Sequence, residues 1–333
     1  MTDRVAVIGS NSFSGSHFVR YVLEQGGEVL GISRSPRPRR EFWPLAWDGG
    51  EPLQSRFRFV QADLQRDLTS ASAAIRDFAP RIVVNLAALG MVAESWQHPL
   101  DYYRTNVVAQ VALHEFLRKL PGLHRYVHVG TPEVYGHTEG AIDESAPLNP
   151  TTPYAASRAA CDLHLNTFLR EYGFPVVWTR AANVFGPGQQ LYRIVPRTLL
   201  ALRLGRTLPL HGGGVSRRSF IHIRDVCVAT LQIAQHGTSG ERYHVSTPEL
   251  VSIRELVEMM CELTGGRFDD VVQLAPERPG KDAAYHLDSG RLRRTLGWSD
   301  TIGLADGLKD TLAWVDSNLA ELQTLPVEYV HRA

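Results

Sequence analysis

A short apolar run followed by a glycine-bearing turn stands near the start of this chain and restricts its fold most strongly. The run Val5-Ala-Val-Ile8 lies between charged residues and Gly9, which is typical of a strand buried in a parallel sheet. The turn Gly9-Ser-Asn-Ser-Phe-Ser-Gly15 follows, and a helical apolar pattern begins at Phe18. Strand, glycine turn and helix in this order favour dinucleotide binding, because the helix N-terminus offers free N–H groups to a pyrophosphate.

The composition of this turn departs from the usual fingerprint at one position. Ser12 stands where the middle glycine is expected, and a serine fits there if its φ is negative. Any tight strand–helix turn shares part of this pattern, so the other strand ends have to support the interpretation. The cofactor contacts predicted in this turn are Gly9, Asn11, Ser12, Phe13, Ser14 and Gly15.

The end of the second predicted strand indicates which dinucleotide to expect. Glu28-Val-Leu-Gly-Ile32 is followed by Ser33 and Arg34, where an NAD-binding chain would have a carboxylate for the ribose 2′-hydroxyl. A guanidinium pairs bidentately with phosphate, so Ser33 and Arg34 predict NADP, with NAD as the alternative. A solvated basic loop is the competing interpretation, because Arg37, Arg39 and Arg40 follow closely.

Two further strand ends complete the predicted cofactor site. The alternating run at 57–62 ends at Asp63 and Leu64, where a carboxylate can bind the adenine amino group or cap the next helix. The apolar strand at 82–86 ends at Leu86, Ala87 and Ala88, whose small side chains permit close approach of a cofactor.

Length and charge exclude several classes of protein. The chain has 333 residues, 44% of them hydrophobic, which suggests one large core and a smaller lobe. A formal net charge of zero argues against a dedicated nucleic-acid or anionic-membrane binder. Cys161, Cys227 and Cys261 have no metal-ligand or disulfide spacing, and no apolar run is long enough to span a membrane. We therefore expect a cytoplasmic protein with no metal centre.

The middle of the chain contains two nearby stretches whose side chains include a hydroxyl, a carboxylate, a phenol and a guanidinium. The apolar run at 126–129 predicts a strand that ends at Gly130-Thr-Pro-Glu-Val-Tyr-Gly136, and Tyr154-Ala-Ala-Ser-Arg158 opens a helical pattern about twenty positions later. The spacing of four residues places Tyr154 and Arg158 on one helix face. This combination suits hydride and proton transfer on a sugar-like alcohol.

The order of elements predicts an α/β fold with a doubly wound, Rossmann-type parallel sheet. After the strand at 176–180 the alternation of strands and helices becomes less regular, and 208–214 reads as a turn-rich insert. Residues 252–264 form an amphipathic helix that Ser252 caps, with Glu255 at the spacing of a capping box. We expect a dinucleotide-binding domain over 1–182, to which about 215–245 returns, and a substrate-binding lobe over 183–330.

Taken together, these residues resemble the extended short-chain dehydrogenase/reductases that act on nucleotide sugars, and most closely the nucleoside-diphosphate-sugar 4,6-dehydratases. The resemblance extends from Gly9 to Trp298. It is carried by Thr131-Pro-Glu-Val-Tyr-Gly136, Asn183-Val-Phe-Gly-Pro-Gly188, Arg218-Ser-Phe-Ile221, and Glu277-Arg-Pro-Gly-Lys-Asp282 followed by Leu296-Gly-Trp298. It implies a cytoplasmic homodimer that pairs two helices per subunit, here those at about 100–118 and 153–171.

The resemblance also implies a role for each residue of the central stretch. Tyr154 would take the proton of the sugar C4 hydroxyl while a nearby cation stabilises the tyrosinate, and Thr131 would orient the same oxygen. Glu133 would then remove the C5 hydrogen so that water leaves from C6. Arg158 would bind the nicotinamide ribose. Substrate contacts carried over from the family are Glu94, Asn183, His211, Arg218 and Arg278.

Two residues depart from the family pattern. Arg158 stands where the family has lysine, and a planar guanidinium does not place its charge as an ammonium does. Pro132 stands where the dTDP-glucose dehydratases have the aspartate that protonates the departing C6 hydroxyl. GDP-mannose dehydratases and UDP-glucuronate decarboxylases also lack that aspartate and keep the glutamate, so Glu133 is expected to act as both base and acid, or water to supply the proton.

Three other functions compete with dehydration. A 4-epimerase also oxidises C4 but needs no base at C5, so Glu133 favours the dehydratase. A UDP-glucuronate decarboxylase usually has an arginine where Gly188 stands. A cofactor-binding regulator without catalysis would explain Pro132 and Arg158, but the joint presence of Thr131, Glu133 and Tyr154 argues against it.

Overall fold

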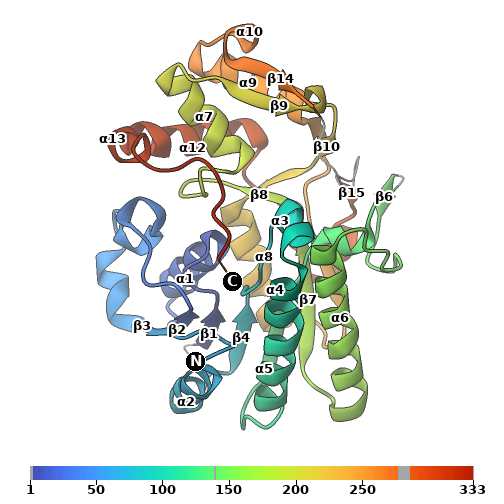
Figure 1. Ribbon diagram of the computed structural model, residues 1–333. Coiled ribbons are helices and arrows are strands. Elements are labelled where there is room, and N and C mark those ends of the chain that lie inside the picture. Colours follow the sequence, from blue (N-terminus) through green and yellow to red (C-terminus); the bar gives the residue numbers. More distant parts are fainter. Residues whose placement is uncertain (1–2, 139, 277–285, 333) are drawn as a thin grey trace.

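A seven-stranded sheet, in which every neighbouring pair is parallel, forms the centre of the molecule, in the order β12-β7-β5-β4-β1-β2-β3 (Figure 1). The computed structural model describes residues 3–138, 140–276 and 286–332. The strand order reverses between β1 and β4, as in a doubly wound fold. The strands of this sheet are β1 Arg4–Ile8, β2 Glu28–Ser33, β3 Phe57–Gln61, β4 Ile82–Asn85, β5 Arg125–Val129, β7 Val176–Ala181 and β12 Arg242–Val245.

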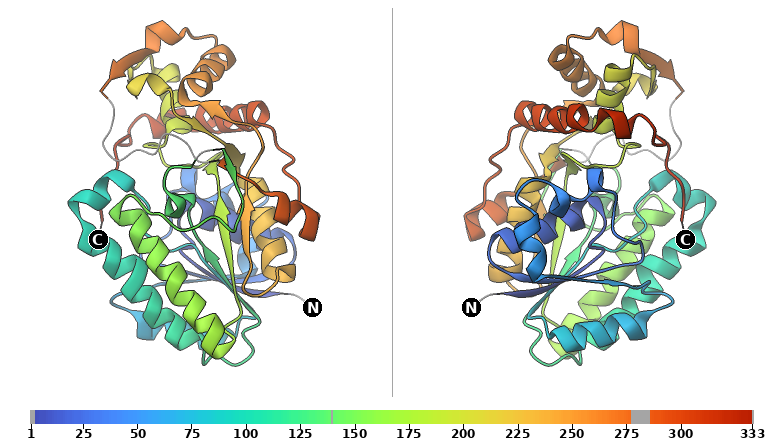
Figure 2. Two further views of the ribbon diagram at one scale, coloured as in Figure 1. Left: turned by 90° about the vertical axis from the view of Figure 1, so that its right-hand side faces the viewer. Right: turned by 90° about the vertical axis from the view of Figure 1, so that its left-hand side faces the viewer.

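The alternation of side chains along each strand supplies one apolar core to each face of the sheet. On β1, Val5 and Val7 pack with helices α1 and α8, whereas Ala6 and Ile8 pack with α2, α5 and α6. Figure 2 shows α8 on the opposite side of the sheet from α5 and α6. These helices are α1 Phe13–Glu24, α2 Leu68–Phe78, α5 Ala109–Leu117, α6 Pro153–Tyr172 and α8 Ile223–His236. The predicted α/β fold class is confirmed.

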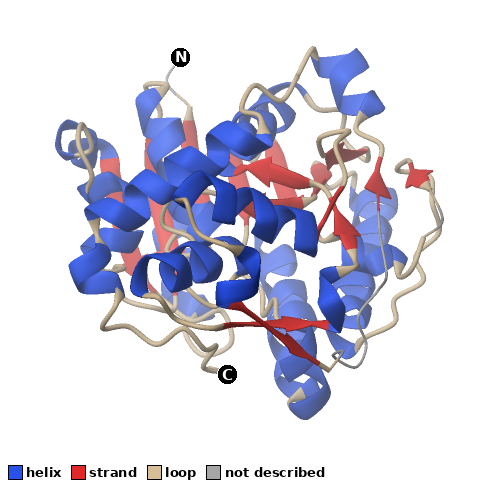
Figure 3. Ribbon diagram, turned by 90° about the horizontal axis from the view of Figure 1, so that it is seen from above, coloured by secondary structure: helices blue, strands red, loops and turns tan. Residues whose placement is uncertain are grey.

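A third core belongs to a smaller lobe above the carboxyl ends of the strands (Figures 1 and 3). It joins helices α7, α9, α12 and α13 to the parallel pair β9–β14. The bounds in the lobe are α7 Ile194–Leu204, α9 Ile253–Thr264, α10 Phe268–Val271, α12 Leu304–Ser317, α13 Leu319–Leu322, β9 Leu208–His211 and β14 Val272–Ala275, whereas α11 Gly290–Leu296 packs on the α8 side of the sheet. Three short pairs connect the lobe to the sheet: β8 Asn183–Phe185 with β11 Phe220–His222, β10 Arg217–Arg218 with β13 Val251–Ser252, and β6 Ala141–Ile142 with β15 His286–Leu287.

The sequence expectations for local structure are met in part. Helix α9 begins with the predicted capping box, in which Ser252 and Glu255 satisfy each other's backbone N–H groups. The expectation of a turn-rich insert over 208–214 is wrong for its first half, because Leu208–His211 is a strand that finds its partner β14 about sixty residues later. Such long-range pairing is invisible in a local pattern.

The helix expected at about 100–118 is part of a longer helical stretch from residue 92 to 117, which is divided into four pieces. They are α3 Val92–Gln97, α4 Pro99–Tyr103, a π-helical segment Arg104–Val108 and α5. The π segment carries Asn106, whose amide binds both backbone groups of Leu89 and the hydroxyl of Ser157. A π-bulge is thus held in place where the loop after β4 meets the start of α6.

A buried polar network fixes α6 on the sheet. Asp162 on α6 and Arg180 on β7 form an ion pair of 2.5 Å, and each side chain is 1% exposed. Arg180 also donates to the Tyr135 hydroxyl at 2.8 Å, which in turn lies 2.8 Å from His244 Nε2. One turn before Asp162, Arg158 donates to the Val129 carbonyl and to His128 Nε2 (3.2 Å). The network therefore determines where the first turns of α6 lie against the end of β5.

None of the helices in the described ranges is long and apolar enough to cross a membrane.

We predict that Asp162→Asn lowers the free energy of unfolding by about 3–5 kcal/mol, because it leaves the buried Arg180 cation without its anion. The matched control is Asp316→Asn in the exposed pair with Arg203 (2.6 Å), where the loss should stay below about 1 kcal/mol. Urea unfolding of both variants measures the two losses. Equal losses would contradict the role assigned to the buried pair.

Stability should also fall in acid because of buried neutral histidines. Burial and then Arg180 lower the pKa of His244 to about 3, so the folded chain binds no proton there until well below the unfolded pKa of 6.5. The unfolded chain gains this proton as the pH falls from 6.5 towards 3, and stability declines over that window by about 1.4 kcal/mol per pH unit for one such group. His244→Gln should flatten the slope of unfolding free energy against pH. An unchanged slope would show that His244 does not contribute.

Candidate active site

The predicted cofactor turn joins β1 to α1 with its backbone pressed against the end of β4. Gly9 has φ +84°, and a Cβ there would meet the backbone nitrogen of Ala87 at 2.8 Å. A Cβ on Gly15 would meet the Gly9 carbonyl oxygen at 2.1 Å. Only glycine fits either position, for two different reasons: backbone conformation at Gly9 and helix–turn contact at Gly15.

Ser12 caps α1 and has φ −71°, which satisfies the condition set by the sequence. Its hydroxyl accepts from Gly15 N–H at 3.1 Å and donates to the Gly9 carbonyl at 2.8 Å. The amides of Phe13 and Ser14 head the helix, where N–H groups have no partner within a helix and the macrodipole is positive. The chemistry of this donor set fits a pyrophosphate.

Asn11 connects the turn to the segment after β2. Its side-chain nitrogen donates to the carbonyls of Ser35 and Pro36, both at 2.8 Å. Ser33 is the last residue of β2, and Arg34 follows it. Arg34 Nη2 donates to the carbonyl of Arg332 at 2.7 Å, while Nη1 is buried and makes no hydrogen bond to a described residue. One of the two terminal nitrogens of the Arg34 guanidinium is thus hydrogen-bonded to the C-terminal segment.

The ends of β3 and β4 complete this edge of the sheet. Asp63 accepts from Gln65 N–H at 2.9 Å in a local turn. Its alternative interpretation as a helix cap is wrong, because α2 begins five residues later with Asp67 at the N-cap position. Leu64 packs against the core on the α2 side, as does Ala87 beside the Gly9 turn.

Two buried amides support the β4 end, and the sequence analysis missed both. Asn85 accepts from Ala87 N–H at 3.0 Å and binds Gln110 and the Tyr126 hydroxyl. Asn106 holds Leu89 further along the same loop. Together they fix the path of 85–89, which includes Leu86 and Ala88. A polar Asn85 at the end of an apolar strand is the one sequence signal that could have indicated this role.

Thr131 begins a short 3₁₀ helix, Pro132–Tyr135, directly after β5. Its hydroxyl accepts from Glu133 N–H at 3.3 Å, and Thr131 is 7% exposed. Pro132 occupies the first helical position, where its missing N–H would have no partner, so proline fits this departure from the family pattern. Gly136 ends the turn with φ +65° against the Asn149 carbonyl. Thr131 and Glu133 therefore stand in one turn at the end of β5.

Tyr154 lies in the first turn of α6, which Thr152 caps. The tyrosine ring is 9% exposed and meets Tyr102 edge to face, with ring centroids 6.2 Å apart. Arg158 follows one turn later on the same face and is 3% exposed. It is no surface arginine: its guanidinium points to the end of β5, where it binds Val129 and His128.

His128 is a further residue near this site that the sequence analysis missed. Burial, and then the cations Arg158 and Arg180, lower its pKa well below the usual range. A neutral His128 accepts the hydrogen bond from Arg158 through Nε2. An apolar strand interrupted by a histidine is a weak signal, because buried histidines are often structural.

The described residues expected to contact substrate come from α3 of the sheet domain and from the short strands β8, β9 and β10. Glu94 on α3 has a buried carboxylate oxygen, Oε2, without a hydrogen bond to any described residue. Asn183 begins β8, and Arg218 on β10 is buried and donates to the Arg217 carbonyl. His211 ends β9, where Nδ1 binds the Pro276 carbonyl at 2.8 Å. Arg278 lies outside the described residues.

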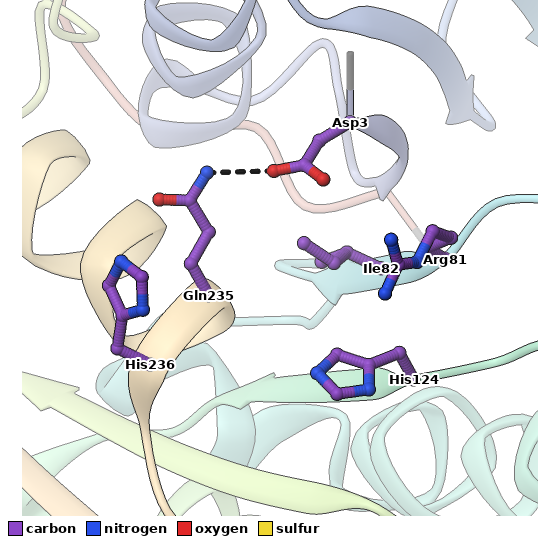
Figure 4. Close-up of a pocket in the computed structure, with 6 residues that line it drawn as sticks. All are labelled: Asp3, Arg81, Ile82, His124, Gln235 and His236. Carbon is purple, nitrogen blue, oxygen red and sulfur yellow. Dashed lines mark hydrogen bonds between the residues drawn. The ribbon is translucent and has the colours of Figure 1, made fainter. Parts of the chain in front are cut away.

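A hollow of about 430 Å³ lies at the opposite edge of the sheet (Figure 4). It is lined by residues at the amino ends of β1, β4 and β5 and at the end of α8, namely Asp3, Arg81, Ile82, His124, Gln235 and His236. Ligands of doubly wound sheets bind at the carboxyl ends of the strands, so this hollow is not the active site.

Two groups of metal-ligand residues occur in the described ranges. His114, His128 and Cys161 form one group within the core. There burial raises the pKa of the Cys161 thiol to about 12 and lowers the pKa of both histidines. His98, Asp101 and His331 form the other, in which the two imidazole planes are parallel within 2°. Lone pairs in these parallel planes do not converge on one ion.

Comparison with known proteins identifies the family. The family model described as GDP-mannose 4,6 dehydratase matches residues 7–311. A dTDP-glucose 4,6-dehydratase of Streptomyces niveus is 34% identical over 326 residues, covering 95% of this chain and 94% of that protein.

Solved structures agree with the sequence comparison. The dTDP-glucose 4,6-dehydratase DesIV of Streptomyces venezuelae, solved with NAD bound, superposes with a TM-score of 0.86 at 32% identity, covering 95% of this chain and 98% of DesIV. A UDP-glucose 4-epimerase of Thermotoga maritima gives 0.84 at 25% identity, covering 95% and 99% of the two chains. On the match to the family model and the curated relative, this chain belongs to the GDP-mannose 4,6-dehydratase family, a nucleotide-sugar branch of the extended short-chain dehydrogenase/reductases.

Proposed function

We propose that the protein is a nucleotide-sugar 4,6-dehydratase that converts a nucleoside-diphosphate hexose into its 4-keto-6-deoxy derivative. The observation that carries the proposal is the pairing of Thr131 and Glu133 at the end of β5 with Tyr154 and Arg158 on α6, at the edge where the Gly9 turn lies. The family model and the relatives named above support the same reaction.

The first step removes two hydrogens from C4 of the sugar. Tyr154 takes the hydroxyl proton, and its place in a buried, aromatic-lined first turn of α6 protects this transfer from bulk water. Thr131, at the end of β5, orients the same oxygen. The Gly9 turn and the start of α1 would hold a nicotinamide dinucleotide, which would supply a reversible hydride acceptor for C4 and C6 and so make the overall reaction redox-neutral.

Glu133 acts in the second step, which distinguishes dehydration from epimerisation. The C4 ketone acidifies the C5 hydrogen, and Glu133 removes it as the general base. The C6 hydroxyl then leaves as water. Because Pro132 has no acidic proton to give, the carboxyl group of Glu133 returns the proton it has just taken. An epimerase leaves C5 untouched, so a carboxylate at this place favours the dehydratase over the similar 4-epimerase.

Arg158 acts on Tyr154 from a buried position in α6. Its bonds to Val129 and His128 hold the guanidinium at the end of β5, four residues from Tyr154 along one helix face. From there its charge stabilises the tyrosinate through space. A longer side chain anchored at the end of β5 thus takes the place of the family's lysine in our proposal, and we assign the nicotinamide ribose to it as well.

The substrate lies between the sheet and the lobe in our proposal. The unpaired Oε2 of Glu94 suits a sugar hydroxyl, since a buried carboxylate oxygen without a described partner costs free energy until a donor arrives. Arg218 and Asn183 would meet the diphosphate, and His211 the nucleotide base. We accordingly divide the chain into a dinucleotide domain over 1–182 with 215–245, and a substrate lobe over most of 183–330.

Exposed apolar side chains support a homodimer. Six of the nine large hydrophobic residues exposed in the described ranges lie on α3, α4, the π segment or α6. Isolated exposed apolar residues are common, but a group on one set of helices indicates an interface. These six residues are Trp96, Leu100, Tyr103, Val108, Leu163 and Tyr172.

The cofactor is best proposed as NAD. The solved relative DesIV carries NAD. Arg34 favoured NADP in the sequence, but one of its two terminal nitrogens is bound to the Arg332 carbonyl. The purified protein should therefore release NAD on denaturation, and mass spectrometry of the supernatant identifies it. Release of NADP alone would reverse this assignment.

We predict that Glu133→Gln stops exchange of the C5 hydrogen with solvent while C4 oxidation continues. Product formation should fall by about 10²-fold or more, the usual size of a general-base contribution. Reduced nicotinamide should accumulate, because hydride cannot return to an intact C6. Absorbance of the reduced cofactor and deuterium uptake at C5 report the two steps separately.

The control for this variant is Glu249→Gln, an exposed carboxylate in the turn after β12, which should leave both steps unchanged. Full activity of Glu133→Gln would refute the role given to Glu133 and would favour the epimerase alternative.

A further inference from the structure

The segment after α13 crosses from the lobe to the dinucleotide edge of the sheet (Figures 1 and 2). We call residues 323–332 the C-terminal strap. Its first half is fixed to the lobe, where Leu325 and Val327 pack on the lobe core and Glu328 forms an ion pair of 2.6 Å with Arg197 on α7. Apolar packing and an ion pair therefore hold the first half of the strap against the lobe.

The second half of the strap passes from the lobe to the sheet domain. Tyr329 meets Tyr192, in the loop before α7, edge to face at 5.2 Å. His331 stacks on His98 with ring centroids 4.5 Å apart, and its Nε2 lies 3.2 Å from the carboxylate of Asp101 on α4. The strap thus bridges the two lobes and ends beside α4, at the edge of the sheet where the predicted cofactor residues lie.

Arg34 is where the strap and the predicted cofactor site meet. The carbonyl of Arg332 accepts from Arg34 Nη2 at 2.7 Å. Nη1 has no hydrogen bond to a described residue. A neutral ribose hydroxyl needs one such donor, whereas a 2′-phosphate carries about two negative charges and binds guanidinium bidentately. With the strap docked, one of the two terminal nitrogens of Arg34 already binds a carbonyl oxygen, which would repel a phosphate oxygen approaching the same nitrogen.

We propose that the C-terminal strap determines dinucleotide selectivity: it keeps Arg34 Nη2 occupied, and so selects against the 2′-phosphate of NADP. Arg34 is the specificity-determining residue, and Tyr329 and His331 are positioning residues that keep the Arg332 carbonyl in place. The proposal rests on the proposed function, since it requires a dinucleotide at the Gly9 turn. It reconciles an arginine at the end of β2 with a preference for NAD.

The test is a pair of fluorescence titrations, with NADH and with NADPH, of the full-length protein freed of bound dinucleotide. The strap is released by the double variant Tyr329→Ala/His331→Ala, which changes no residue of the turn or the catalytic set. NADPH should bind about tenfold more tightly to this variant than to the unchanged protein, the size of one charge-assisted hydrogen bond, while NADH affinity changes far less. Adding Arg34→Ala to the double variant should abolish the gain for NADPH.

The control is His236→Ala, an exposed histidine at the far end of α8, which should leave both affinities unchanged. An unchanged ratio of NADPH to NADH affinity in the double variant would overturn the proposal, as would an equal weakening of both, which a merely structural strap would cause. A gain for NADPH that survives Arg34→Ala would also overturn it. A protein that binds neither dinucleotide would instead refute the proposed function and this inference with it.

Discussion

The ion pair between Asp162 and Arg180 is the interaction on which the arrangement of the site depends. It joins α6 to β7 in the interior, where an uncompensated charge is costly, so the helix has one stable position on the sheet. Tyr154 and Arg158 are carried on the two turns of α6 that precede Asp162, and Arg180 also holds Tyr135 at the end of the Thr131 turn. One buried pair thereby links the phenol, the guanidinium, the hydroxyl and the carboxylate.

Much of the sheet domain was predictable from sequence because its signals are local. Buried parallel strands are short apolar runs, and Gly9 and Gly15 mark a turn whose backbone contacts exclude any side chain. The capping box of α9 was legible for the same reason, since Ser252 and Glu255 act within one turn. The family resemblance then joined these local signals into one fold.

The parts that escaped prediction depend on contacts between distant residues. The strand Leu208–His211 exists because β14 pairs with it, and the role of Arg34 depends on Arg332, almost three hundred positions away. His128 and Asn85 support the site through buried hydrogen bonds to Arg158 and to the backbone of Ala87. In the sequence, each looks like an ordinary polar residue in a strand. The prediction of NADP was made from the sequence around Arg34, without its contact to Arg332. The hydrogen bond to the C-terminal strap changes which cofactor Arg34 is expected to favour.

The central claim is that C5 of the sugar is deprotonated after C4 is oxidised. The most direct measurement is to incubate the protein with a panel of nucleoside-diphosphate hexoses in deuterated water and to analyse the products by NMR and mass spectrometry. The account predicts a 4-keto-6-deoxy sugar that carries deuterium at C5. A product inverted only at C4, with no label at C5, would contradict it.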